Sequence, residues 1–198
     1  MKKILVTLAL VAMTTAAFAQ NFGVRAGANL NDIQGYDADH TVLDLGAYVG
    51  AVVDLALPVA NLGLRLEPGF SMQGASRKGE TLGAQWNTKY AANYVNIPVL
   101  VEYKLLGGDL ALMAGPQLGF CVGMSSKTNS GSTTVETKYN STDDYNAFDA
   151  GVAFGASYMV VPNVAVDFRY YLGLSNMSKA SNTNWNNRVA QIGVAYMF

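Results

Sequence analysis

The stretch NRVAQIGVAYMF, residues 187–198, closes the chain and decides its fold. Every second residue from Phe198 back to Ala190 is apolar, and this period of two predicts a β-strand with two different faces. The strand ends on an aromatic residue with no charged tail after it. These features are typical of the closing strand of an outer-membrane barrel, whose outer face meets lipid and whose terminal aromatic side chain lies at the interface.

The first residues have the pattern of a secretory signal peptide. Lys2 and Lys3 form a positive start, residues 4–11 are apolar, and residues 17–19 read Ala-Phe-Ala, a small-residue cleavage pattern. We therefore expect a signal peptide over residues 1–19 and an outer-membrane β-barrel domain over residues 20–198. No later stretch has the roughly 18 uninterrupted apolar residues that a membrane-spanning helix needs, so strands would have to cross the membrane.

Composition narrows the class of protein. Without the two lysines of the signal peptide the chain has 11 basic and 14 acidic residues, a formal charge of −3, which argues against nucleic acid as a partner. The 20 glycines and 11 tyrosines favour a sheet protein with many turns. Cys121 is the one cysteine, so it forms no internal disulfide, and we expect it to be a small packing residue on the inner face of its strand.

Eight segments have strand character, and the links between them alternate in length. We expect strands at 22–30, 43–57, 62–72, 94–104, 109–122, 148–160, 164–174 and 188–198. Long polar links lie at 31–42, 73–93, 123–147 and 175–187, and short links lie at 58–61, 105–108 and 161–163. Long outer loops, tight periplasmic turns and an even strand number are typical of outer-membrane barrels. The predicted fold class is all-β, an eight-stranded antiparallel up-and-down transmembrane β-barrel.

The two faces of these strands differ in charge. Alternate residues of each strand form one apolar face, and the only charged residue on this face is Arg188, at the outer end of the last strand. The other face carries the charges, and we predict a lumen charge network of Arg25, Asp54, Arg65, Glu67, Glu102, Asp167 and Arg169. A soluble lipocalin-like barrel would place its apolar face inside instead. The signal peptide and the aromatic placement favour the membrane barrel.

Aromatic residues near strand ends predict two girdles at the membrane interfaces. The periplasmic girdle would contain Phe22, Tyr103, Tyr158, Tyr196 and Phe198, and the outer girdle would contain Phe70, Tyr94, Phe120 and Phe148. Three prolines, Pro68, Pro98 and Pro116, lie inside predicted strands. Because proline has no N–H to donate to the ladder, we expect a β-bulge at each one.

Several segments resemble the PorT-like outer membrane β-barrel family. They are LEPGF at 66–70, YVNIPVLVEYK at 94–104, AGPQLG at 114–119 and FRYYLGL at 168–174, together with FGVRAG at 22–27 and the last strand. The resemblance covers essentially the whole mature chain and implies an eight-stranded barrel in the outer membrane. It brings no catalytic motif. Some relatives are associated with protein secretion across the outer membrane.

Sites for chemistry are sparse. An eight-stranded barrel is filled by side chains, so the lumen charges are expected to form a plug, with a narrow proton or small-ion path as the alternative. A surface nucleophile would need His40, the one histidine, as its base. Asp32, Asp37, Asp39 and Asp44 could gather a calcium ion, and Asp143 and Asp144 form a second acidic cluster. Neither group has EF-hand spacing, so solvated loop acids are the default interpretation. We predict no catalytic, cofactor-binding or metal-binding residue.

The predicted function is therefore that of a small, non-enzymatic outer-membrane barrel, structural or presenting extracellular loops for interaction. Its expected partners are outer-membrane lipid, the barrel-assembly machinery through the last strand, and a protein at the extracellular loops. The polar stretch 125–146 is a candidate partner-binding segment or a mobile surface. The alternatives are an accessory component of a secretion or assembly machine, small-solute passage, and a surface enzyme that uses His40.

Overall fold

The computed structural model describes residues 21–34, 41–42, 44–81, 84–130, 133–139, 145–179 and 185–198. The expected signal peptide, His40 and the acidic pair Asp143 and Asp144 lie outside the described residues. Within them, no helix is long and apolar enough to cross a membrane.

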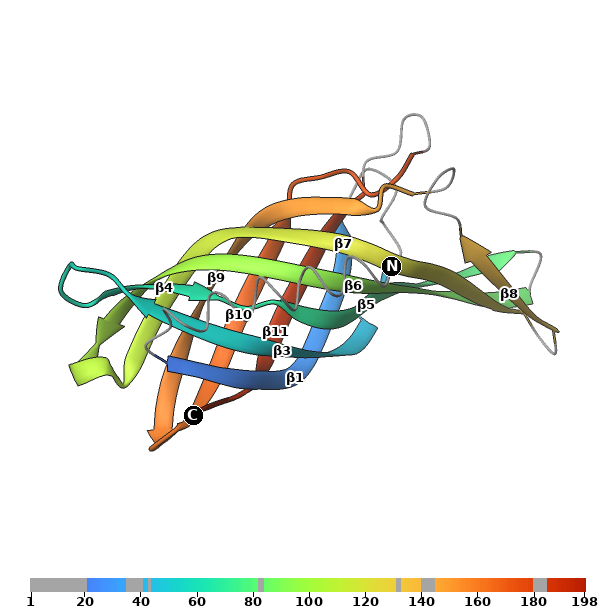
Figure 1. Ribbon diagram of the computed structural model, residues 1–198. Coiled ribbons are helices and arrows are strands. Elements are labelled where there is room, and N and C mark those ends of the chain that lie inside the picture. The colour runs from blue at the N-terminus through green and yellow to red at the C-terminus, as the bar shows by residue number, and fades with distance from the viewer. Residues whose placement is uncertain are drawn as a thin grey trace.

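The described chain is almost entirely antiparallel β-structure (Figure 1). The strands are β1 (Asn21–Gln34), β2 (Thr41–Val42), β3 (Asp44–Ala56), β4 (Leu62–Leu66), β5 (Gly69–Thr81), β6 (Ala84–Leu105), β7 (Leu110–Ser130), β8 (Thr133–Tyr139), β9 (Phe148–Val161), β10 (Val164–Gly173) and β11 (Asn186–Met197). A single 3₁₀ turn, η1 (Leu106–Gly108), links β6 to β7. It contains three successive residues with positive φ, two of them glycines, as a tight reversal requires.

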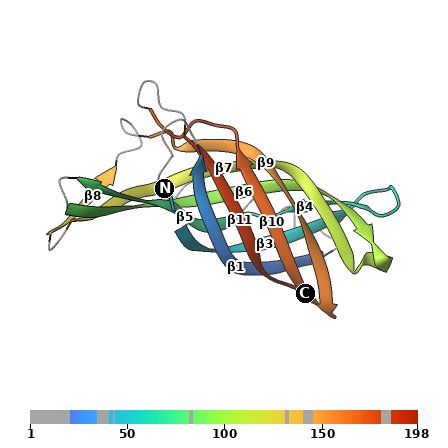
Figure 2. The same ribbon diagram turned by 180° about the vertical axis from the view of Figure 1, so that it is seen from behind.

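Eight columns of strand close into a barrel, as the sequence predicts. The sheet runs β1–β3–β4/β5–β6–β7–β9–β10–β11, and β11 pairs with β1 from Gly23–Met197 to Gln34–Asn186. Figure 2 shows β1 and β11 side by side at this closure. β4 and β5 count as one column because both keep the same register against β6, with Leu66 opposite Val99 and Gly69 opposite Asn96.

The expected β-bulges at the three prolines are wrong. The register shifts of the described ladders lie between Asn93 and Tyr94 and between Val164 and Ala165. Pro116 stays in regular register with Val152, and Pro68 separates β4 from β5 without changing their alignment. A missing N–H removes one ladder bond, and the wall tolerates that loss without inserting an extra residue.

Two of the expected loops are long β-hairpins. β5 and β6 stay paired out to Thr81–Ala84, and β7 continues to Ser130 before β8 returns beside it. Their residues are polar on both faces but include many Thr, Tyr and Ser, so the hairpins form ladders without burying a core. Residues 73–81, 84–93, 125–130 and 133–139 are therefore strand rather than irregular loop. Figure 1 shows them projecting beyond the barrel, away from the short turns.

The faces of the barrel are inverted relative to a soluble protein. Charged residues such as Arg169 and Glu102 have no solvent exposure, whereas outward apolar residues such as Val24, Leu112 and Val194 are each nearly half exposed. Burying charge while exposing an apolar belt is unfavourable in water and favourable in a bilayer. This distribution supports the membrane barrel over the lipocalin-like alternative.

Candidate functional site

Glu67 is the centre of the lumen charge network. It lies between β4 and β5, and its carboxylate accepts a hydrogen bond from Arg25 Nη1 of β1 at 2.7 Å. Arg169 of β10 donates to both of its oxygens, with Nη2 2.9 Å from Oε1. Arg65 Nη1 lies 3.9 Å from Oε1. Three strands that are distant in sequence thus converge on one buried carboxylate.

The other members of the network surround this centre. Arg25 also donates to Asp167 on β10. Arg65 makes a two-point contact with Asp54, from Nε at 2.7 Å and Nη2 at 2.8 Å. Glu102 Oε1 lies 2.8 Å from Arg65 Nε, but neither oxygen of Glu102 accepts a hydrogen bond. The structure thus brings all seven predicted residues into one cluster of four acids and three arginines.

Above the charges lies a layer of amides that sequence reasoning did not identify. Asn29 Nδ2 donates to Ser71 Oγ at 2.8 Å and to the Met72 carbonyl at 2.9 Å, and Gln191 donates to Asn29 Oδ1 at 2.9 Å. Asn187 donates to Gln73. The sequence pattern could have identified them, because each of these polar residues occupies an inward-facing position of its strand.

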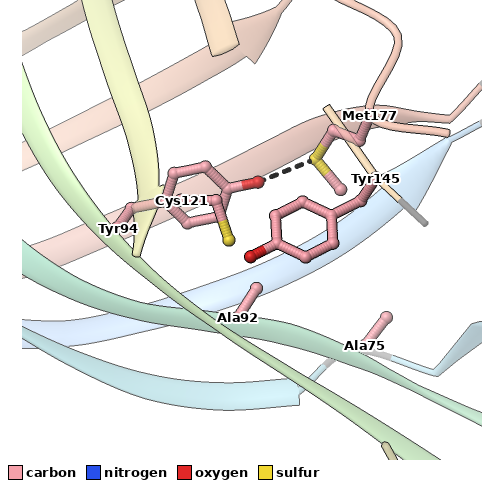
Figure 3. Packing of buried hydrophobic residues seen from close by; sticks show 6 residues of the cluster. All are labelled: Ala75, Ala92, Tyr94, Cys121, Tyr145 and Met177. Atoms are coloured by element: carbon pink, nitrogen blue, oxygen red, sulfur yellow. Dashed lines mark hydrogen bonds between the residues drawn. The ribbon is translucent and has the colours of Figure 1, made fainter. Parts of the chain in front are cut away.

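An apolar lid covers the outer end of the lumen (Figure 3). Tyr94 of β6 and Cys121 of β7 meet Tyr145 and Met177, which lie outside the strands in the links that precede β9 and β11. Tyr94 donates a hydrogen bond to Met177 Sδ at 3.2 Å. Ala75 and Ala92 complete the cluster. Two outer links therefore fold back over the barrel mouth.

The assignment of Tyr94 to the outer aromatic girdle is wrong. Its side chain is 2% exposed and belongs to the lid. Adjacent residues of a strand face opposite sides, so Tyr94 points inward next to the outward Val95. Position near the strand end is not sufficient to place an aromatic residue at the lipid interface.

The other eight girdle candidates point outward. They are Phe22, Phe70, Tyr103, Phe120, Phe148, Tyr158, Tyr196 and Phe198, each between 39% and 59% exposed. Several form ring contacts: Phe22 with Phe198 at 4.9 Å, Tyr196 with Phe198 at 5.3 Å, and Phe120 with Phe148 at 5.4 Å between centroids. They mark the two ends of an apolar outer surface.

The end of the lumen near the short turns holds a cavity of about 210 Å³. Asp54, Arg65, Lys104 and Asp109 are among its lining residues. From this end toward the outside, the lumen passes from the cavity to the charge network, the amide layer and the apolar lid. Beyond the cavity, ionic, polar and apolar side-chain layers thus occupy the lumen in turn.

Beyond the lid, β5, β6, β7 and β8 form a sheet with β2 at its other edge. We expect this sheet to lie outside the cell and call it the extracellular sheet. Thr88 and Thr128 hydroxyls are 2.9 Å apart across β6 and β7, and the Ser126 and Tyr139 hydroxyls are 2.9 Å apart across β7 and β8. β7 continues ten residues beyond Phe120, the last residue that it pairs with β9, which is about 30 Å of extended chain.

The described residues contain no group of three or more His, Cys, Asp or Glu side chains arranged to hold a metal ion. Asp44, one of the candidate calcium ligands, forms an ion pair with Lys89 at 3.0 Å. The calcium candidates Asp37 and Asp39 lie outside the described residues, as does the one histidine.

Comparison with known proteins agrees with this architecture. Residues 18–179 match the family described as "Outer membrane protein beta-barrel domain". The chain belongs to this family. Family membership places the protein among the barrels of the bacterial outer membrane. No curated protein sequence matches the chain.

Solved structures of small barrels are similar to this one. Neisserial surface protein A (NspA) is 15% identical, with a TM-score of 0.55 and 89% of this chain and 97% of that chain covered. Ail, the attachment invasion locus protein of Yersinia pestis, is 13% identical, with a TM-score of 0.49 and coverage of 90% and 98%. A major outer membrane protein from Thermus thermophilus is 18% identical, with a TM-score of 0.47 and coverage of 90% and 98%. At this identity the likeness to NspA shows the fold alone.

Proposed function

We propose that this protein is a closed, non-enzymatic outer-membrane barrel that presents its extracellular sheet to a partner protein. The observation that carries the proposal is the continuation of β5, β6 and β7 beyond the barrel, joined by β8. A barrel that served only as a membrane plug would not need strands that extend roughly ten residues past its last pair with β9.

The filled lumen supports display rather than transport. A solute would have to displace Glu67 and three arginines, then the amide layer, and then the Tyr94–Met177 lid. Breaking even one buried ion pair costs about 3–5 kcal/mol, so a stationary plug is favoured over a small-solute path.

Three accompanying predictions complete the proposal. The signal peptide is cleaved after residue 19, the assembly machinery engages the last strand, and the eight exposed aromatic residues lie at the lipid interfaces. Assignment of the chain to the PorT-like family rests on the quoted sequence motifs alone. An accessory role in a secretion or assembly machine rests on the same motifs. Such a role would use the same extracellular sheet, and co-purification of a stable complex would distinguish it from a free-standing barrel.

Cysteine labelling on intact cells tests the display proposal. In a Cys121→Ala background, Asn129→Cys on β7 should react with a membrane-impermeant maleimide, because Asn129 is exposed on the part of β7 that lies beyond its last pair with β9. Asn163→Cys, in the periplasmic turn between β9 and β10, is the matched control and should react only after permeabilisation. Labelling of Asn163→Cys on intact cells, or protection of Asn129→Cys there, would refute the proposed orientation. Planar-bilayer recordings should show no conductance steps.

A further inference from the structure

β8 is an edge of the extracellular sheet in the described part of the chain. The strand order ends at β8, which pairs with β7 over Met124–Tyr139 to Ser130–Thr133. It takes the place beside β7 that β9 occupies lower in the barrel. Residues 134–138 are all exposed, and the seven-residue strand contains no proline or glycine. Natural proteins usually protect such edges, because their backbone groups can pair with another strand.

The sequence of β8, TTVETKY, is complementary to itself in one antiparallel register. When Thr137 of one copy lies opposite Thr137 of a second copy, Glu136 faces Lys138 of the second copy, and Lys138 faces its Glu136. Val135 then lies opposite Tyr139 of the second copy, an apolar–aromatic pair. Opposite charges and such mixed pairs stabilise directly opposed positions on antiparallel strands.

The neighbouring registers lack this complementarity. Centring the pair on Glu136 places two glutamates opposite each other, and centring it on Lys138 places two lysines opposite each other. β7 extends the pattern, because Lys127 pairs with Glu136 across β7 and β8. In the Thr137-centred register, positive and negative side chains therefore alternate across the joined sheets.

We propose that β8 is a self-pairing edge through which two copies of this protein join, with antiparallel β8 strands centred on Thr137. This inference rests on the proposed function, since it names the partner of the extracellular sheet as a second copy of the chain. The joined sheet would be continuous from β7 of one barrel, through both β8 strands, to β7 of the other.

Disulfide trapping tests the register. The folded protein is purified in detergent, where the two barrels are free to take any relative orientation, and heat-modifiable migration confirms that each variant is folded. In the Cys121→Ala background, Thr137→Cys should form a disulfide-linked dimer under mild oxidation, because directly opposed residues have Cβ atoms close enough for a disulfide. Thr134→Cys, on the same exposed strand, has no cysteine opposite it in this register and is the control. Equal cross-linking rates for the two variants would overturn the proposal.

Charge exchange gives an independent test. Glu136→Lys and Lys138→Glu should each abolish dimers of their own kind, because like charges then face each other. A mixture of these two variants should form heterodimers, and the double exchange Glu136→Lys/Lys138→Glu should restore homodimers. Size-exclusion chromatography with light scattering measures the masses. Dimers that persist in either single variant, or a mixture that stays monomeric, would contradict the pairing.

The outcomes separate this inference from the display proposal. If Asn129→Cys is labelled on intact cells but Thr137→Cys does not cross-link, the extracellular sheet stands and self-pairing falls. If Asn129→Cys is protected on intact cells, the display proposal falls, and self-pairing falls with it.

Discussion

Replacing Glu67 with Gln removes the negative charge on which three arginines converge while keeping the shape of the side chain. Arg25 would keep its contact with Asp167, and Arg65 would keep its two hydrogen bonds to Asp54. Arg169 would be left with Met113 Sδ, 3.8 Å from its Nη2, and with one amide oxygen in place of a carboxylate. Arg169 has no solvent exposure, so its charge would be buried without a full partner.

Removing one partner of a buried ion pair costs about 3–5 kcal/mol. We expect Glu67→Gln to lower the free energy of unfolding by that amount, which reduces the folding equilibrium constant by a factor of roughly 10²–10³ or more. Urea titration in lipid vesicles, followed by tryptophan fluorescence and by heat-modifiable migration, measures the loss. The substitution should leave the apolar outer surface unchanged.

Glu102→Gln is the matched control, because it removes the same charge from the same network. Both variants change the network from four acids and three arginines to three of each. Glu102 contacts Arg65 Nε at 2.8 Å without hydrogen-bond geometry, and Arg65 retains Asp54. We expect its unfolding free energy to stay within about 1 kcal/mol of the wild-type value, because breaking a buried pair is costly when a charge is left without a partner, and Arg65 keeps both hydrogen bonds to Asp54. Equal losses in the two variants, or a stable Glu67→Gln barrel, would refute the view that Glu67 organises the plug.

Three further predictions concern the wall, the lid and the girdle. A Cβ at Gly115 would lie 2.1 Å from the Val99 carbonyl oxygen, so Gly115→Ala should destabilise the barrel by about 1–3 kcal/mol in urea titration, whereas Gly123→Ala, with open space around it, should not. Met177→Ala removes the sulfur that accepts the hydrogen bond of the Tyr94 hydroxyl, which should destabilise the closed lid by about 1 kcal/mol. The buried Cys121 should then react with maleimide roughly fivefold faster, and an unchanged rate would argue against a lid. Phe198→Ala loses ring contacts to Phe22 and Tyr196, each worth about 0.5–1.5 kcal/mol, so less heat-modifiable barrel should accumulate than with Val194→Ala on the same outward face.

The barrel could be predicted from the sequence because a membrane barrel leaves a strong periodic signal. Lipid requires an uncharged outward face, and outer-membrane barrels alternate short periplasmic turns with longer outer loops. Arg25, Glu67 and Arg169 were recognisable as lumen residues because each lies between the apolar residues of its strand and so on the opposite face. Which arginine contacts which acid depends on the register between strands, and that is not encoded in any single strand.

The extracellular sheet was less predictable. A hairpin that projects into water can be polar on both faces. The sequences of the β5–β6 and β7–β8 hairpins therefore do not alternate between apolar and polar residues, and they resemble loops. The lid was hidden for a different reason. Tyr145 and Met177 come from links between strands, and no local pattern shows that they fold back onto Tyr94.

The central claim is that the chain forms a closed barrel in the outer membrane, and heat-modifiable migration of the protein from fractionated envelopes tests it most directly. The protein should appear in the outer-membrane fraction, migrate as a compact band when unheated and shift on boiling to the mass of its unfolded chain, which is at most 21.1 kDa. A soluble periplasmic protein whose migration does not change on boiling would contradict the claim, and the exposed apolar face would then have to be the core of a different fold.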